Sequence, residues 1–223
     1  MIRLTSMEQA GLALAVMSDK RDGDCGTDAA AAAFRGRLNV RVDRLVRLRQ
    51  VHGTRIVDVA AIDPVSRLLP EADGVMTSQP RVALGIGVAD CAPVLLYNPV
   101  RGAVAALHSG REGVRGNIAA AGVEALRAQC GGSSGQIVAL IGPCARICCY
   151  EVSPEMAADW RAAGLPGRGR NLDMSAAICA QLENAGVIRH NIHVVPHCTV
   201  CGGGFFSYRA DKTSHRNLVV VML

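Results

Sequence analysis

Residues 82–97 read VALGIGVADCAPVLLY, the most apolar run of the 223-residue chain. Its first part, Val82–Val88, is continuously apolar, which is typical of a strand buried on both faces. Val94–Tyr97 and Ala103–Leu107 have the same character, and the turn Asn98-Pro99 separates them. Three buried strands in close succession predict the central sheet of a domain with a sizeable core.

Helix and strand patterns continue on both sides of this stretch. The sequence predicts helices at Ala29–Arg37 (capped by Asp28), Gly116–Cys130, Pro154–Ala163 and Met174–Ala185. It predicts further strands at Ile2–Val16 (or a hairpin), Leu45–Val51, Thr54–Ala60, Ile137–Ile141, Asn191–Val195 and Leu218–Leu223. Since no repeat, linker or low-complexity segment divides the chain, we expect one α+β domain over residues 1–223.

The composition limits the class of protein. Half of the residues are apolar but only 3% are aromatic, so aliphatic side chains must fill the core. The formal net charge is +5, with a modest concentration of arginines in Arg35–Arg49. No aromatic residues are interleaved there to stack on bases, so this segment indicates a solvated helix face and no nucleic-acid partner. Asp90 and Pro93 interrupt the longest apolar run, which excludes a membrane span.

Nine cysteines could indicate a secreted protein with disulfides. However, the count is odd, and several cysteines lie in apolar or Gly-Pro contexts. Charged residues flank the apolar stretch Ala10–Met17, which favours a buried strand over a signal peptide. We therefore expect a cytoplasmic protein whose reduced thiols serve metal binding, catalysis or core packing.

Two of the six histidines stand at predicted strand ends beside glycine-containing turns. These are His52, before Gly53, and His108, two residues before Gly110; Cys91 follows the long apolar strand. Two imidazoles and one thiolate suit zinc and leave a fourth position for water or substrate, as in catalytic zinc sites. Such a cation would keep Cys91 as a thiolate and lower the pKa of bound water.

Simpler interpretations fit the same residues. A cysteine after a buried strand usually fills the core, and a histidine beside glycine usually donates a hydrogen bond within a turn. Alternatively, Cys91 is a nucleophile with His108 as its base, in a cysteine hydrolase without metal. The spacing of His52, Cys91 and His108 in the sequence does not distinguish among these interpretations.

A CxxC motif occupies Cys198–Cys201, a pattern found in zinc ribbons and redox pairs. There is no second CxxC, although Cys144 and the pair Cys148-Cys149 could supply partners. The sequence therefore allows a structural zinc site here, and equally allows buried or loop thiols.

Two segments could bind phosphate. Ser207 and Arg209 follow the glycines Gly202–Gly204, and a hydroxyl and a guanidinium beside a glycine loop suit an anion. The alternative is that aromatic side chains of this segment close one end of the core, with Arg209 at the edge. Arg111 and Arg115, just after His108, raise the same possibility of phosphate binding.

Several short motifs occur in a fixed order along the chain. They are Gln50-Val51-His52-Gly53, Ala72-Asp73-Gly74, Ala89-Asp90-Cys91-Ala92-Pro93-Val94, Leu107-His108-Ser109-Gly110, Ile141-Gly142-Pro143-Cys144, Tyr150-Glu151-Val152, Cys198-Thr199 and Phe205-Phe206-Ser207-Tyr208-Arg209. In this order they resemble the YfiH/laccase-domain family, also called the polyphenol oxidase or purine nucleoside phosphorylase family. The resemblance runs from about Leu45 to the C-terminus.

The resemblance implies an α/β/β/α sandwich with mixed sheets and a Zn²⁺ ion on His52, Cys91 and His108. The activities it implies are phosphorolysis of adenosine, inosine and methylthioadenosine, and zinc-dependent deamination of adenosine. An older family label is copper-dependent phenol oxidation. Three ligands of this kind do not resemble the several-copper cluster of a laccase, so we give this label less weight.

The chain departs from the family pattern in three places. The family usually has His-Ala-Gly-Trp-Arg-Gly where this chain has His108 followed by Ser109–Gly113, so an aromatic residue of the pocket is missing. The usual Arg-x-Gly-Gly-Val-Ser loop is replaced by Ser18–Asp24. The acidic residue that often follows the CxxC is Gly202 here. These changes affect the expected substrate preference more than the zinc site.

We therefore expect a zinc-dependent enzyme that acts on purine nucleosides and phosphate, as a monomer or weak homodimer without a membrane partner. For deamination, zinc would activate water to attack C6 of adenine, and Asp90 is the acid/base candidate by position. For phosphorolysis, arginines such as Arg209, Arg111 or Arg21 would bind phosphate. A non-enzymatic protein, with a structural zinc or none, is a further alternative.

Overall fold

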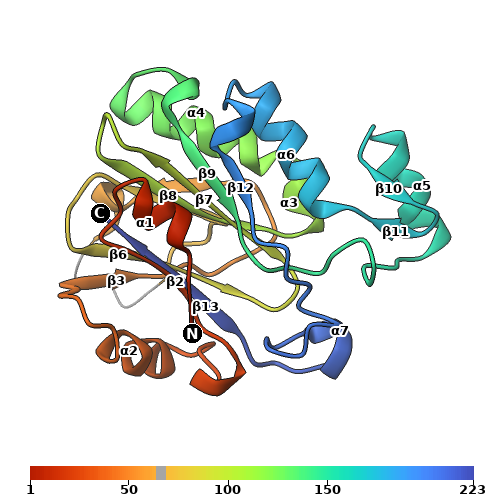
Figure 1. The fold of residues 1–223 in the computed structure, drawn as a ribbon, viewed down its shortest axis with the longest axis horizontal. Helices are drawn as coiled ribbons and strands as arrows, with labels where there is room; N and C mark the ends of the chain where they lie inside the picture. Colours follow the sequence, from red (N-terminus) through yellow and green to blue (C-terminus); the bar gives the residue numbers. More distant parts are fainter. Residues whose placement is uncertain (64–68) are drawn as a thin grey trace.

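Two mixed β-sheets face each other in the computed structural model, with helices on both outer faces (Figure 1). The structure describes residues 1–63 and 69–223. The α/β/β/α layering confirms the predicted single α+β domain with mixed sheets.

The first sheet has five strands and joins the two ends of the described chain. Its last strand, β13, lies antiparallel between β2 and β6, while β3 is parallel to β6. In spatial order the strands are β1 (Ile2–Arg3), β2 (Leu14–Met17), β13 (Asn217–Met222), β6 (Val82–Val88) and β3 (Arg44–Val46).

The second sheet has six strands, with an antiparallel centre and a parallel pair at each edge. Strands β7 and β8 form its middle, a hairpin whose strand residues are all buried. In spatial order the strands are β12 (Ile192–Val194), β9 (Val138–Ile141), β7 (Ala92–Asn98), β8 (Ala103–Ser109), β5 (Gly74–Thr77) and β4 (Ile56–Asp58).

Seven α-helices and a small hairpin complete the described part of the chain. The helix α2 covers the five-stranded sheet, and α4 and α6 cover the six-stranded sheet (Figure 1). The helices are α1 (Thr5–Gln9), α2 (Asp28–Gly36), α3 (Arg111–Arg115), α4 (Ile118–Cys130), α5 (Pro154–Ala162), α6 (Met174–Asn184) and α7 (Tyr208–Asp211); β10 (Gly167–Arg168) and β11 (Asn171–Leu172) form the hairpin.

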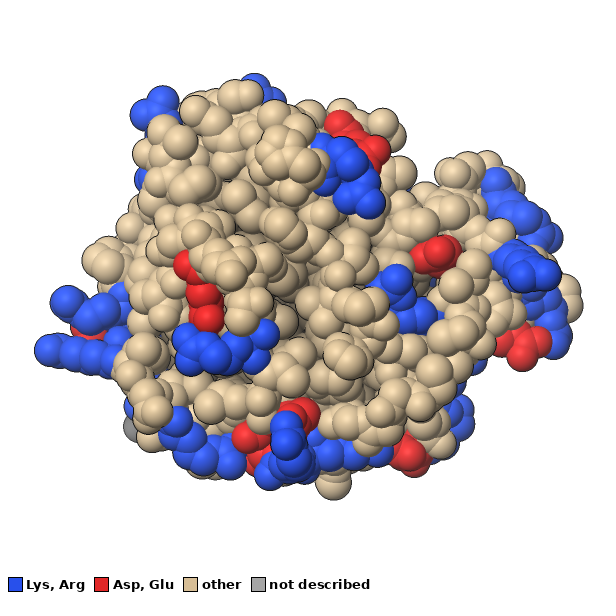
Figure 2. Space-filling view, in the orientation of Figure 1, with Lys and Arg blue, Asp and Glu red and all other residues tan. Residues whose placement is uncertain are grey.

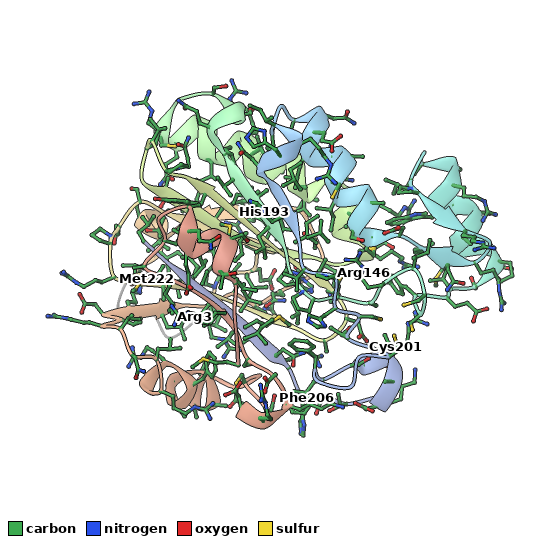
Figure 3. The ribbon with its side chains drawn as sticks, in the orientation of Figure 1. Arg3, Arg146, His193, Cys201, Phe206 and Met222 are labelled. Atoms are coloured by element: carbon green, nitrogen blue, oxygen red, sulfur yellow. The ribbon has the colours of Figure 1, made fainter. Side chains whose placement is uncertain are left out.

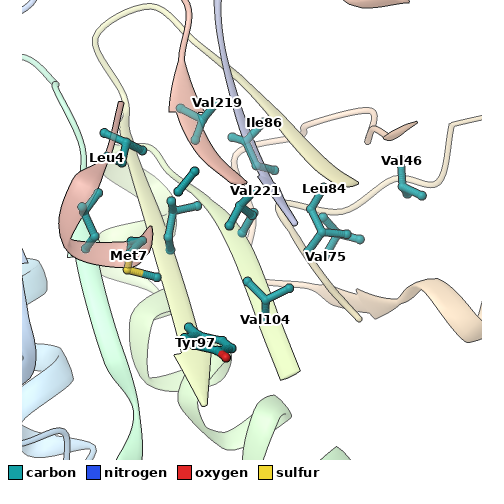
Figure 4. Close-up of a cluster of buried hydrophobic side chains, with 14 of the residues drawn as sticks. Leu4, Met7, Val46, Val75, Leu84, Ile86, Tyr97, Val104, Val219 and Val221 are labelled. Atoms are coloured by element: carbon teal, nitrogen blue, oxygen red, sulfur yellow. The ribbon is translucent and has the colours of Figure 1, made fainter. Parts of the chain in front are cut away.

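The core between the sheets is almost wholly aliphatic, as the low aromatic content requires. Leu84 and Val221 from one sheet meet Val75 and Val104 from the other (Figure 4). Burying one such side chain contributes about 1.5–3 kcal/mol. Packing of both sheet faces therefore explains why residues 82–97 are apolar at nearly every position.

Several short elements differ from the predictions. The segment Ile2–Val16 contains α1 between its two strands, because Met7 turns inward and is completely buried in the core. The helix α2 is capped by Thr27, whose hydroxyl accepts from the backbone N–H of Ala30, and not by Asp28. The strand predicted at Leu45–Val51 is β3, which ends at Val46.

The charged surface carries mixed signs. On the face drawn in Figure 2, Lys and Arg side chains are dispersed and interleaved with Asp and Glu. In the arginine-rich segment, Arg47 pairs with Asp28 at 2.6 Å and Arg41 with Asp43 at 2.7 Å. The lack of a nucleic-acid partner stays a prediction. Among the described residues, no helix is long and apolar enough to cross a membrane.

Candidate functional site

Side chains of His52, Cys91 and His108 converge at one end of the six-stranded sheet. Their potential ligand atoms all lie within 4.8 Å of one another. The two imidazole rings meet edge to face, with centroids 4.8 Å apart and an interplanar angle of 79°. His108 is buried, Cys91 is partly exposed and His52 is exposed, so the group is open on one side.

Strand register brings two of these residues together. The chain leaves the five-stranded sheet at Val88 and enters β7 at Ala92, so Cys91 lies at the crossing between the sheets. In the β7–β8 pair, Pro93 is opposite His108 and Ala92 is opposite Ser109. Cys91 therefore lies beside the end of β8, next to His108.

Asp73 links His52, the third residue of the group, to His108 at the end of β8. Its Oδ1 accepts from the backbone N–H of His52 at 2.9 Å and lies 2.8 Å from Nδ1 of His108. Its Oδ2 accepts from the backbone N–H of Gly53 at 2.6 Å. The carboxylate is completely buried and fixes the His52 loop, where His52 has a φ of 62°.

The same contact orients the His108 ring. With Nδ1 occupied by Asp73, Nε2 is the nitrogen left for a ligand. A metal-bound histidine usually has its other ring nitrogen bonded to a carboxylate or carbonyl, which fixes the tautomer and raises the basicity of the ligand. The Asp73–His108 pair is this arrangement.

Gly110 leaves space for an ion among the three side chains. A Cβ at this position would lie 2.9 Å from Cδ2 of His52 and 3.3 Å from Sγ of Cys91. Only glycine therefore fits without moving them. Together with the two imidazoles, the thiol and the Asp73 contact, this space fits a zinc ion with three protein ligands and one open position.

The charges in the group are strongly coupled. Burial raises the pKa of Cys91, but hydrogen bonds from His108 and His52 outweigh this and lower it to about 6. Burial lowers the pKa of His108, but Asp73 and Cys91 raise it to about 9. Burial also disfavours ionised Asp73, yet the bond from His108 and the N–H of Gly53 keep its pKa below the usual value. These shifts favour a thiolate on Cys91, an imidazolium on His108 and a carboxylate on Asp73 near neutral pH.

Two cavities open onto the group. The larger, of about 580 Å³, is lined by His52, Cys91 and His108 together with Gln50, Tyr150, Tyr208, Arg209, Lys212 and Arg216, among others. The smaller, of about 430 Å³, is lined by His52, Cys91, Arg111, Glu112, Tyr150, Val152, Met156 and Arg209. Both cavities are lined by His52, Cys91, Tyr150 and Arg209, so the two spaces adjoin at these residues.

Arg209 is held in place by three contacts. Its guanidinium stacks 4.8 Å from the centroid of the Tyr150 ring, and Nη1 donates to the carbonyl of Glu151 at 2.6 Å. Its backbone N–H donates to Oδ2 of Asp90 at 2.7 Å, while Oδ1 of Asp90 accepts from Thr199 at 2.6 Å. Asp90 thus uses both carboxylate oxygens to fix the cavity wall.

The sequence also proposes Arg111, Arg21 and Ser207 as phosphate-binding residues, and these three lie in different surroundings. Arg111 begins α3, pairs with Glu112 at 2.7 Å and lines the smaller cavity. Arg21 lines neither cavity and pairs with Asp19 at 2.6 Å, so its position does not support phosphate binding. Ser207 is buried, caps α7 by accepting from the N–H of Ala210, and lines neither cavity.

The sequence-based reasoning missed several residues of the site. Asp73 enters the sequence analysis only as part of the motif Ala72-Asp73-Gly74, although a buried aspartate between two candidate ligands is the natural partner of a histidine. Lys212 and Tyr208 line the larger cavity from α7 and its end, a helix that the sequence pattern does not predict. The motif that contains Tyr150 was the available signal for the aromatic wall.

The family described as multi-copper polyphenol oxidoreductase laccase matches residues 11–223. A purine nucleoside phosphorylase of Streptomyces coelicolor is 40% identical over 191 residues, covering 80% of this chain and 75% of that protein. A purine nucleoside phosphorylase of Mycobacterium tuberculosis H37Rv is 35% identical, covering 96% of this chain and 88% of its own.

Solved structures agree with this match. The crystal structure of YlmD from Geobacillus stearothermophilus superimposes with a TM-score of 0.81 at 28% identity, covering 94% of this chain and 91% of that one. The hypothetical protein YfiH of Bacillus licheniformis gives a TM-score of 0.75 at 29% identity, over 86% of this chain and 78% of that one. With this fold and this ordered set of site motifs, the chain belongs to the YfiH/laccase-domain family, whose members include proteins named purine nucleoside phosphorylase.

Proposed function

We propose that this protein is a zinc-assisted purine nucleoside phosphorylase acting on adenosine, inosine and methylthioadenosine. One observation carries the proposal: Arg111 and Arg209 line the same cavity as His52 and Cys91. Two guanidinium groups beside an open three-ligand group suit the binding of a phosphate. The relatives named purine nucleoside phosphorylase, at 35% and 40% identity, support the same activity.

The donor set of His52, Cys91 and His108 fits Zn²⁺ better than a multi-copper cluster, which needs more nitrogen ligands than two imidazoles. When bound there, zinc supplies a positive charge that favours the thiolate of Cys91 and polarises whatever occupies its fourth position.

The nucleoside occupies the larger cavity in this proposal. Its volume of about 580 Å³ lies within the usual range for small-molecule sites. Tyr208, with 57% of its surface exposed, stands at the wall of this cavity and can stack on the purine. The ribose then lies near the wall formed by Tyr150 and Arg209, facing the smaller cavity.

Phosphate binds in the smaller cavity, where Arg111 and Arg209 donate to its oxygens. One phosphate oxygen attacks C1′ of the ribose, the bond from C1′ to the purine nitrogen breaks, and the base leaves with the bonding electrons. The base takes a proton from solvent, and the products are the free purine and ribose 1-phosphate. Asp90 acts as a positioning residue for Arg209, since both of its oxygens already accept hydrogen bonds.

Product analysis tests this proposal. Zinc-loaded protein is incubated with adenosine or inosine, with and without phosphate, and the products are identified by mass. We expect free base and ribose 1-phosphate only when phosphate is present. Inosine formed from adenosine without phosphate would instead demonstrate the deamination that the family resemblance implies. Conversion of neither nucleoside would contradict the enzymatic proposal, and His52→Ala serves as the inactive control.

A cysteine hydrolase is the second candidate, because the lowered pKa of Cys91 and the raised pKa of His108 favour a thiolate–imidazolium pair. The two candidates differ in metal dependence. Removal of zinc abolishes phosphorolysis, whereas it frees Cys91 for acyl transfer and for alkylation. A chelated protein that gains esterase activity, blocked by iodoacetamide, would favour the hydrolase.

A further inference from the structure

A second group of potential metal ligands lies away from the three-ligand group, and we name it the four-cysteine cluster. Its sulfur atoms all lie within 4.8 Å of one another. Two thiols come from the loop after β9 and two from the CxxC motif. The members are Cys148, Cys149, Cys198 and Cys201.

Backbone pairing brings the two loops together. Cys144 and Cys198 form a parallel bridge, in which the N–H of Thr199 donates to the carbonyl of Cys144 at 3.0 Å. The side chain of Arg146 extends toward the second loop and donates to the carbonyl of Val195. Figure 3 shows Arg146 and Cys201 on these adjoining loops, next to α7. The cluster therefore follows from a fixed backbone and not from a chance meeting of surface side chains.

The spacing of the sulfur atoms fits a metal better than a disulfide. Sγ of Cys148 and Sγ of Cys201 are 3.9 Å apart. Zinc–sulfur bonds of about 2.3 Å in a tetrahedron place neighbouring sulfurs about 3.8 Å apart, whereas a disulfide requires about 2.05 Å. All nine cysteines are free thiols in this structure.

The CxxC turn has the shape of a metal-binding loop. The N–H of Gly202 donates to the carbonyl of Cys198 at 3.0 Å, and a Cβ at position 202 would lie 2.5 Å from that oxygen. Only glycine therefore fits this turn without a shift of the backbone.

We propose that the four-cysteine cluster binds a structural zinc ion. Four thiolates in a tetrahedron form a closed site with no position for substrate, and each thiol releases its proton to solvent on binding. Cys144 is excluded from the ligand set, because it lies buried beneath the loop as part of the core around α6.

The bound ion would stiffen the wall of the candidate functional site. Thr199, inside the CxxC motif, donates to Asp90, and Tyr150, directly after Cys149, stacks on Arg209. Both contacts start from the loops that the ion would connect. This proposal concerns a separate site and does not depend on the proposed enzymatic activity.

Metal analysis of variants tests the proposal. Protein from zinc-supplemented cells is purified anaerobically without chelator, and zinc per chain is measured for wild type, His52→Ala, Cys201→Ser and Cys130→Ser. We expect Cys201→Ser to lose one zinc relative to wild type, and His52→Ala to retain the ion of the four-cysteine cluster. Cys130→Ser, which changes a thiol outside both groups, keeps the wild-type content. Equal zinc in Cys201→Ser and Cys130→Ser would overturn the proposal.

Differential alkylation gives a test on the unaltered protein. Cys148 and Cys201 are exposed thiols, so without a metal they react readily with iodoacetamide. We expect them to be protected in zinc-loaded protein and to react after a strong chelator is added. Equal alkylation rates in both states, or a disulfide between any two of the four in anaerobically prepared protein, would refute the structural zinc. Loss of protection in His52→Ala would likewise contradict a separate site.

Discussion

Asp73 lies 2.8 Å from His108, carboxylate oxygen Oδ1 to ring nitrogen Nδ1, with both side chains buried. This one contact fixes which nitrogen of His108 faces the open centre of the group. The same carboxylate accepts from the backbone of His52 and Gly53, so it holds two ligands of the proposed zinc site at once.

Replacing Asp73 by asparagine therefore tests the zinc site without removing a ligand. We expect zinc affinity to fall by about 10–100-fold, because the ring of His108 loses its orienting acceptor and some basicity. Competition with a chromogenic chelator measures this change. Asp43→Asn, which removes a surface carboxylate paired with Arg81, is the matched control and should bind zinc as wild type does. Unchanged affinity in Asp73→Asn would contradict the role given to this contact.

A methyl group at position 110 should displace the ligands. In Gly110→Ala, the new Cβ meets His52 and Cys91 at 2.9 Å and 3.3 Å, so we expect zinc content to fall sharply while the fold persists. Gly36→Ala is the control, since no atom lies within 4 Å of a Cβ built there. In the helix α2 this change should raise stability by about 0.5–1 kcal/mol. Zinc content and thermal unfolding of both variants provide the comparison, and full zinc occupancy in Gly110→Ala would exclude the proposed geometry.

Arg111 and Arg115 lie one turn apart on α3, and only Arg111 lines the cavity with Cys91. We expect Arg111→Gln to raise the KM for phosphate about 10-fold or more, as loss of one charge-assisted contact of about 1.5–3 kcal/mol implies. The KM for the nucleoside should change little. Arg115→Gln should leave both constants near wild type, and steady-state kinetics with varied phosphate compares the two. Equal effects from both substitutions would indicate a general electrostatic influence and not a phosphate contact.

Asp19 provides a pH-dependent contribution to stability. Hydrogen bonds from Arg21 lower its pKa from 3.8 to about 2, despite the opposing effect of burial. Because the folded-state pKa lies below that of the unfolded chain, the contribution is complete above about pH 4 and is lost as the pH falls toward 2. With Arg21 largely exposed, we expect Asp19→Asn to cost about 1–2 kcal/mol at pH 7 and almost nothing at pH 2. Urea unfolding at several pH values measures this, and a cost that does not vary with pH would contradict the ionic origin.

Much of the architecture was predictable because buried strands leave a strong pattern. The strands β6, β7 and β8 were predicted from residues 82–107, and the helices α2, α4, α5 and α6 were predicted to within a few residues. Short elements were missed for a physical reason. The helices α1, α3 and α7 have five residues or fewer, too short to be stable alone, so their conformation depends on contacts elsewhere in the chain.

The candidate site, like the fold, was predictable only in part. The sequence alone singled out His52, Cys91 and His108, since scarce histidines and a cysteine at strand ends are visible in a linear reading, and the ordered motifs identified the family. The ligation of zinc by His52, Cys91 and His108 and the catalytic roles of these residues stay predictions.

Only the tertiary structure showed that Asp73 joins two of the three residues, that Gly110 leaves the space between them, and that Arg21 and Ser207 are engaged elsewhere. The reason is that chain composition and periodicity report burial. Distances between side chains, in contrast, depend on strand register and on how loops from two sheets meet. The apolar stretch at residues 82–97 was thus enough to predict buried strands, while the register of β7 against β8 decided which side chains meet at their end.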